Sequence, residues 1–201
     1  NELVYGDAPA NDGVVFTGFK GFDTETSIGY TGTVSYSYLD STDTVINKFA
    51  PAYTDGTAAG TQIEYKIVVD VTALEADNYE FTAVDGKLTF KKYKLEDGQT
   101  TANGSATLNL IYGDATPAYS VSGLIFPAGA PETVATLGLE FDGKYEQKNG
   151  VGTYTVTATL EHANYVLVEV DSMTIVVAAK AIKLVPDDKS SVYGDAVPTF
   201  T

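Results

Sequence analysis

The feature of this chain that most constrains its fold is a repeated tripeptide. Three copies of Tyr-Gly-Asp are present, at Tyr5-Gly6-Asp7, Tyr112-Gly113-Asp114 and Tyr193-Gly194-Asp195. Each copy follows a hydrophobic residue and is followed by an alanine and a nearby proline. Such recurrence indicates a small unit used repeatedly, and arrays of this kind are more often spacers or multivalent binders than enzymes. We therefore expect no enzymatic activity.

Further ordered motifs divide the chain into repeats. Asn78-Tyr79 is followed by Val84-Asp85, and Asn164-Tyr165 is followed by Val170-Asp171 at the same spacing. We expect a first repeat domain at residues 1–92, a second at 93–180, and the opening segment of a third at 181–201. The first is divergent, with a Tyr-rich insertion at residues 15–53. No Pro-rich linker separates the repeats, so we expect an elongated arrangement with direct junctions.

Composition and periodicity predict a mainly β fold. Hydrophobic residues make up 44% and charged residues 19% of the chain, which is enough for packed cores. Residues 154–159 and 34–38 alternate apolar and small polar side chains, as half-buried strands do. Asp-Gly and Asn-Gly pairs at residues 12, 55, 85, 142 and 149 predict tight turns with positive φ. The one helical candidate is a short helix or turn at residues 130–137, and residues 100–105 are the most loop-like stretch.

Two topologies remain open for each repeat, a β-grasp-like one and an immunoglobulin-like sandwich. The segment 181–201 has no domain of its own. We expect it to be held along the second repeat, or by strand addition to another molecule.

Net charge excludes several partner classes. The chain carries −15, and all twelve basic residues are lysines. Nucleic-acid binding and anionic membrane surfaces both require clustered positive charge, so neither is expected. Cysteine is absent. We find no signal peptide, membrane span or lipidation motif, which suggests an internal segment of a longer protein without membrane insertion in this part.

Longer stretches of the sequence carry a family resemblance. Residues 111–124 and 183–201 resemble the opening half of an MBG-type (Tyr-Gly-X) repeat, and residues 151–156, 163–165 and 173–176 resemble its closing half. This family comprises tandem small β-domains in large secreted or surface-attached bacterial proteins, often called adhesins. The resemblance implies an extracellular stalk or array, at the bacterial cell surface or secreted, and brings no catalytic residues. Residues 15–53 depart from the pattern.

The repeated motif has a physical explanation without a ligand. A glycine between an aromatic residue and an aspartate suits a turn, where glycine adopts a conformation costly for other residues. The aspartate side chain caps free backbone amides, and the tyrosine packs its ring on the core with its hydroxyl at the edge.

Metal chemistry has few candidates. His162 is the only histidine and is predicted to be a surface turn residue. Calcium is the most plausible cofactor because it takes oxygen ligands, and its candidates are Asp40 with Asp43, and Asp187 with Asp188. Neither pair has the regular spacing of a calcium loop, so we assign no metal site and no cofactor.

Glycan binding is the second functional hypothesis. Sugars stack on aromatic rings, and four tyrosines are concentrated in the divergent insertion: Tyr30, Tyr36, Tyr38 and Tyr53. The leading hypothesis is a structural and interaction segment of a bacterial surface protein. The alternative is a carbohydrate-binding module of a secreted glycan-degrading system. The expected partners are neighbouring repeats of the same chain, and a host or environmental glycan or protein.

Overall fold

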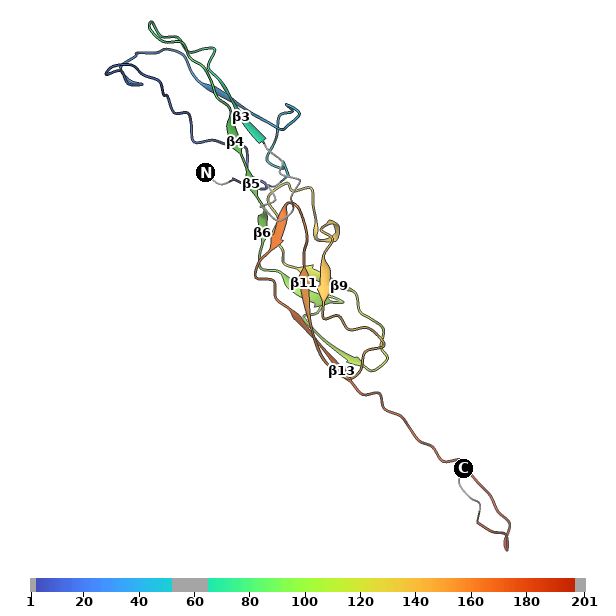
Figure 1. Cartoon of the computed structure of the whole chain (residues 1–201). Coiled ribbons are helices and arrows are strands. Elements are labelled where there is room, and N and C mark those ends of the chain that lie inside the picture. The colour runs from blue at the N-terminus through green and yellow to red at the C-terminus, as the bar shows by residue number, and fades with distance from the viewer. Residues whose placement is uncertain (1–2, 52–64, 198–201) are drawn as a thin grey trace.

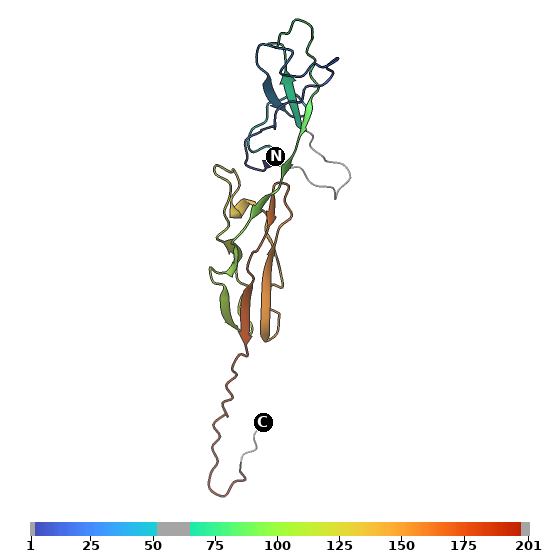
Figure 2. The ribbon, with the colours of Figure 1, turned by 90° about the vertical axis from the view of Figure 1, so that its left-hand side faces the viewer.

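The chain forms an elongated, mainly β structure, as its composition predicts. The computed structural model describes residues 3–51 and 65–197. Two groups of strands lie end to end along one axis, and a C-terminal segment extends beyond them (Figures 1 and 2). We call residues 3–91 unit one and residues 93–178 unit two.

The strands are short, and most of them come in pairs. Unit one contains β1 (Leu3–Val4), β2 (Ser35–Leu39), β3 (Tyr65–Asp70), β4 (Gly86–Leu88) and β5 (Phe90–Lys91). Unit two contains β6 (Tyr93–Leu95), β7 (Gln99–Ala102), β8 (Thr107–Ile111), β9 (Tyr119–Ser122), a 3₁₀ turn η1 (Val134–Thr136), β10 (Glu140–Asp142), β11 (Gly152–Thr159), β12 (Tyr165–Leu167) and β13 (Met173–Ala178).

Unit two is built on a four-stranded mixed sheet in the order β10-β11-β13-β8. The pairs β10–β11 and β11–β13 are antiparallel, whereas β13–β8 is parallel. Two smaller pairs complete the unit, because β7 runs antiparallel to β9 and β6 runs parallel to β12. The core of the unit contains Val156, Met173 and Ile175, all fully buried.

Unit one repeats the same strand order. β2 pairs with β3 and β3 with β4, both antiparallel, and β5 continues β4 after one residue. β1 then pairs in parallel with β5, as β8 does with β13. The order β2-β3-β4/β5-β1 therefore matches β10-β11-β13-β8, so the sequence motifs reflect a repeated topology.

The expected alternation of side chains is confirmed on both central hairpins. In β11, Tyr154, Val156 and Ala158 are buried or half-buried, and the threonines between them are exposed. In β2, Tyr36 and Tyr38 are half-buried between exposed serines. These strands form because β-branched and aromatic residues fit a pleated surface with one packed face.

The Tyr-Gly-Asp motif is a turn that ends a parallel edge strand. The amide of Asp7 donates to the carbonyl of Val4 at 2.8 Å, and Gly6 has φ of +101°. The Asp7 carboxylate accepts the amide of Val4 at 2.8 Å, which confirms the predicted capping role. The second copy has the same geometry, because Asp114 Oδ2 accepts the amide of Ile111 at 2.8 Å.

Three sequence predictions of local structure need correction. The first half of the expected loop at 100–105 belongs to β7, in which Thr100, Thr101 and Ala102 are buried. The prediction was wrong because small and polar residues are typical of loops, whereas here neighbouring strands bury them. Gly86 and Gly150 have no positive φ, and Gly86 is the first residue of β4, so these two pairs are not the expected turns.

Other turn predictions hold. Gly13 and Gly143 have φ of +98° and +71°. The pair at residue 55 lies outside the described residues. The predicted helical segment shortens to the three-residue turn η1.

The C-terminal segment does not pack along unit two, contrary to one of our two expectations. Residues 179–197 contain no strand and are all exposed. Figures 1 and 2 show the segment running away from the last strand, β13. Its large apolar side chains, among them Ile182 and Leu184, therefore remain exposed.

Candidate functional site

The two units meet at a carboxylate shared by two tyrosines. The Tyr5 hydroxyl donates to Glu132 Oε1 at 2.9 Å, and the Tyr165 hydroxyl donates to Glu132 Oε2 at 2.8 Å. Tyr5 belongs to the Tyr-Gly-Asp turn of unit one, whereas Tyr165 begins β12 of unit two. Both rings are almost completely buried in a core that also contains Phe90 and Leu95. The largest apolar cluster therefore lies at the junction and joins the units.

Burial and hydrogen bonding set the charges of this cluster. Burial and the adjacent Glu132 carboxylate raise the pKa of Tyr5 to about 12. Burial and the same carboxylate raise the pKa of Tyr165 as well. Burial works to raise the pKa of Glu132, but the hydrogen bonds from Tyr165 and Tyr5 outweigh it and the pKa is lowered. Glu132 is thus an ionised acceptor held by two neutral phenols.

The turn glycine of unit one also belongs to the junction. A Cβ added to Gly6 would lie 2.6 Å from the Cβ of Pro127, so only glycine allows this approach. Next to it, Lys48 Nζ donates to the carbonyl of Ala128 at 2.8 Å and lies 4.8 Å from the centre of the Phe49 ring. The turn therefore serves both as a strand end and as a docking surface.

The same turn is open at the far end of unit two. Tyr112, the equivalent of Tyr5, is 48% exposed, and no atom lies within 4 Å of a Cβ added to Gly113. Ile111 and Val176 are also partly exposed there. Unit two therefore ends in a surface of the kind that unit one uses to contact its neighbour.

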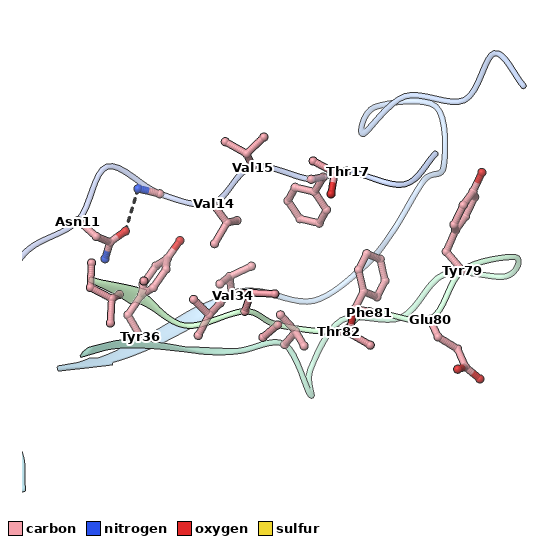
Figure 3. Close-up of a pocket in the computed structure, with 18 of the residues that line it drawn as sticks. Asn11, Val14, Val15, Thr17, Val34, Tyr36, Tyr79, Glu80, Phe81 and Thr82 are labelled. Atoms are coloured by element: carbon pink, nitrogen blue, oxygen red, sulfur yellow. Dashed lines mark hydrogen bonds between the residues drawn. The ribbon is translucent and has the colours of Figure 1, made fainter. Parts of the chain in front are cut away.

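An open groove lies in unit one, with a volume of about 460 Å³. One wall is the extended run of residues 13–17, and the other is formed by β2, β3 and residues 79–84. Figure 3 shows the run from Asn11 to Thr17 crossing over the strand that carries Tyr36, with Tyr79 towards one end. The lining is rich in aromatic side chains: Phe16, Phe19, Tyr36, Tyr79 and Phe81.

The structure brings two of the predicted glycan candidates to this groove. Tyr36 lines the groove. Tyr30 stacks on Phe16, which also lines the groove, with ring centroids 5.2 Å apart. Tyr38 packs against the junction core, and its hydroxyl accepts from Asn11 Nδ2 at 2.6 Å. Tyr53 lies outside the described residues.

The acidic residues considered as calcium ligands either stabilise local structure or lie in the exposed C-terminal segment. Asp40 Oδ1 accepts from the Thr42 hydroxyl and from the amides of Thr44 and Thr42, and these hydrogen bonds close a turn and lower the pKa of Asp40. Asp43 forms an ion pair with Lys66 at 2.8 Å. Asp187 and Asp188 lie in the exposed C-terminal segment. Within residues 3–51 and 65–197, no three metal-ligating side chains come together.

His162 lies in the turn before β12. Its Nδ1 accepts the amide of Asn164 at 3.1 Å, and its ring lies 5.1 Å from that of Tyr165. It is a half-buried turn residue that supports the position of Tyr165.

Sequence reasoning missed Glu132 and Asp23. The Tyr79 hydroxyl donates to Asp23 Oδ2 at 2.6 Å, in the way that Tyr165 donates to Glu132. Both acids lie in irregular segments without a shared motif. The sequence therefore shows the tyrosine donor, through the recurrent Asn-Tyr pair, but not the acid that accepts its hydrogen bond.

Comparison with known proteins gives no match to a family model, a curated protein or a solved structure. None of the helical structure in the described residues has the length and apolar character needed to cross a membrane.

Proposed function

We propose that this chain is a segment of an extracellular bacterial surface protein of MBG-type repeats, acting as a tandem-repeat stalk or adhesin module. The observation that supports it is the junction, where Tyr5 of unit one and Tyr165 of unit two bind the same Glu132 carboxylate. A buried, aromatic contact between successive repeats gives an array a defined direction. The partners of each repeat are first of all its neighbours in the chain, and no catalysis is assigned.

Junction rigidity is the property that a stalk needs, and it can be measured by distances between spin labels. The chain has no cysteine, so the exposed positions Ser37→Cys and Thr155→Cys place one label on each unit. We expect one narrow distance distribution, which Glu132→Ala broadens. Glu140→Ala, an exposed acid on β10, serves as the control and should leave the distribution unchanged. A broad distribution in the unmodified junction would contradict the stalk.

Location is tested separately on cells. Antibodies against this segment should label intact cells of the source bacterium, and protease added outside the cells should remove the signal. Labelling that requires permeabilised cells would contradict a surface location.

The aromatic groove favours one second candidate, a carbohydrate-binding module. Tyr36 lines the groove and stands where a sugar ring could stack. A glycan array would then show binding that Tyr36→Ala abolishes, while Tyr112→Ala, at the far end of unit two, leaves it intact. Absence of binding by the unmodified chain would remove this candidate.

A further inference from the structure

Unit two contains two runs of chain that lie side by side and point in the same direction. The first run is residues 93–111, which include β6, β7 and β8, and the second is residues 165–178, which include β12 and β13. β6 pairs in parallel with β12, and β8 pairs in parallel with β13. The run by which the chain enters the unit is thus paired with the run by which it leaves.

Backbone hydrogen bonds join these two runs over their whole length. At one end, the amide of Tyr93 donates to the carbonyl of Asn164 at 2.8 Å. At the other end, the amide of Tyr112 donates to the carbonyl of Ala178, also at 2.8 Å. Further amide-to-carbonyl bonds lie between these ends, from Val168 to Leu95, from Asp171 to Gly98, from Thr100 to Asp171 and from Thr174 to Ala106.

A side chain bridges the point at which the register of this pairing shifts. The tight turn at Asn103-Gly104 lies within the first run, so β8 pairs with β13 in a different register from that of β6 with β12. Before that turn, Gln99 is bridged in parallel to Asp171. Its Nε2 donates to the carbonyl of Ser172 at 3.1 Å. The two parallel ladders are therefore connected to each other.

The direction of the runs decides how the unit responds to tension along the chain. β6 lies next to unit one, and β13 ends at the opposite end of unit two (Figure 1). Tension therefore pulls the first run towards unit one and the second run away from it, so the two runs are forced to slide past each other. Because interstrand hydrogen bonds join parallel strands side by side, sliding loads many of them at once.

The second run is also held on its other side. β13 pairs in antiparallel fashion with β11, from Val156 opposite Met173 to Gly152 opposite Val177. The side chains of Met173 and Ile175 are fully buried in the core of the unit. Withdrawal of β13 would break two ladders and also expose these apolar side chains to water.

We infer that unit two is a mechanical clamp, in which the parallel pairing of residues 93–111 with residues 165–178 carries tension along the chain as shear. The use of such a clamp rests on the proposed function, because a stalk is a protein that has to carry tension. The strength itself belongs to the fold of unit two and can be measured on the purified chain.

Single-molecule force spectroscopy on the full chain tests the direction of loading. The chain has no cysteine, so two introduced cysteines define where the force acts. Lys91→Cys with Lys180→Cys places exposed attachment points before β6 and after β13, and loads the two runs in shear. The control pair, Ala115→Cys with Lys180→Cys, places both points at the end of the unit where Tyr112 binds Ala178. Force then pulls the end of β13 sideways and opens its pairing one bond at a time.

The shear geometry should require the higher force. At the same loading rate, we expect unit two to unfold at a force at least about twofold higher in shear than in the control geometry, because bonds broken together resist more than bonds broken in turn. The four positions used are exposed, and urea denaturation of each double-cysteine chain verifies that it is folded.

Two substitutions test whether the paired runs set the barrier. Leu108 in β8 and Phe141 in β10 are both half-buried and pack against the same core. At a fixed force in the shear geometry, Leu108→Ala should raise the unfolding rate at least about tenfold, because it loosens the ladder that has to break. Phe141→Ala should raise that rate less than about threefold, because the β10–β11 hairpin is still formed when the ladder breaks. Both substitutions should lower the free energy of unfolding in urea.

The outcomes separate the clamp from the stalk. Equal forces in the two geometries overturn the clamp, and so do equal effects of Leu108→Ala and Phe141→Ala on the unfolding rate. If Leu108→Ala does not fold, the comparison of geometries decides alone. A weak unit two in a protein that labels intact cells and keeps a narrow spin-label distance contradicts only the clamp. A strong unit two in a protein that lies inside cells contradicts only the proposed function.

Discussion

The ring of Tyr5 meets the ring of Tyr165 edge to face, with 5.3 Å between centroids and 81° between planes. Edge-to-face contact is the arrangement that the aromatic quadrupole favours, and it adds to the burial of both rings. The contact also brings both hydroxyls to one carboxylate, that of Glu132. The Tyr-Gly-Asp motif of unit one thus contacts the Asn-Tyr motif of unit two. A single isolated unit would not require such a contact.

Removal of one hydroxyl should weaken this junction measurably. Tyr5→Phe deletes a hydrogen bond to a charged acceptor but leaves the ring in place and Tyr165 bound. We expect a loss of about 1.5–3 kcal/mol in the free energy of unfolding, the usual contribution of a hydrogen bond to a charged group. Urea denaturation followed by tyrosine fluorescence measures the loss. Tyr112→Phe is the control at a half-exposed position, and an equal effect of both substitutions would refute the role of the junction.

Alkaline pH should destabilise the junction in a defined window. Burial raises the pKa of Tyr5 from 10.0 to about 12, and the pKa of Tyr165 is raised too. Below pH 10 these groups are protonated in the folded and unfolded chain alike. Above it the unfolded chain loses protons first, so stability falls as pH rises through the folded pKa.

The comparison that isolates this effect uses the double variant Tyr5→Phe with Tyr165→Phe. Thermal unfolding between pH 9 and 12 should show a smaller loss of stability in the double variant than in the unmodified chain. Parallel curves for the two proteins would show that other groups cause the alkaline loss.

Two of the turn glycines provide matched positions for one substitution. Gly6 and Gly113 have φ of +101° and +92°, so alanine is strained at both, by roughly 1–2 kcal/mol. Only Gly6 packs against Pro127, and overpacking there should add about 1–3 kcal/mol. Gly6→Ala should therefore destabilise the chain more than Gly113→Ala in chemical denaturation. Equal losses would mean that Pro127 moves aside without cost.

Local patterns in the sequence predicted the fold where the cause of the structure is itself local. The alternation of Tyr154, Val156 and Ala158 is sufficient for a half-buried strand, and the Gly6 turn follows from backbone sterics. β7 was missed because Thr100 and Thr101 are buried by strands far along the chain, and no local pattern reports that. The parallel pairing of β8 with β13 is likewise a long-range property.

The candidate site was less predictable than the fold. Tyr36 was correctly placed in an alternating strand, but its position in a groove depends on residues 13–17 and 79–84, which the sequence did not connect. The role of Glu132 could not be predicted, because no local sequence pattern distinguishes it from the other acids among the 27 acidic residues. The alignment of the repeats was informative for a different reason. It allows the turn at Gly6, which packs against Pro127, to be compared with the open turn at Gly113.

The aspartates of the three motifs allow a last prediction, in which the same substitution at three positions has two different outcomes. Asp7 and Asp114 each accept the amide three residues earlier, at 2.8 Å, and so close the end of a strand that pairs in parallel with the last strand of its unit. Alanine at either position leaves that amide without its cap and should cost about 0.5–2 kcal/mol, as the loss of similar caps does. Asp195 lies in the exposed C-terminal segment, where the turn supports no sheet.

Asp195→Ala should therefore leave the free energy of unfolding unchanged in the same urea titrations. An equal loss at all three positions would indicate that the carboxylates act through net charge. No loss at Asp7 or Asp114 would show that water replaces the cap, in which case the glycine conformation alone explains why the motif recurs.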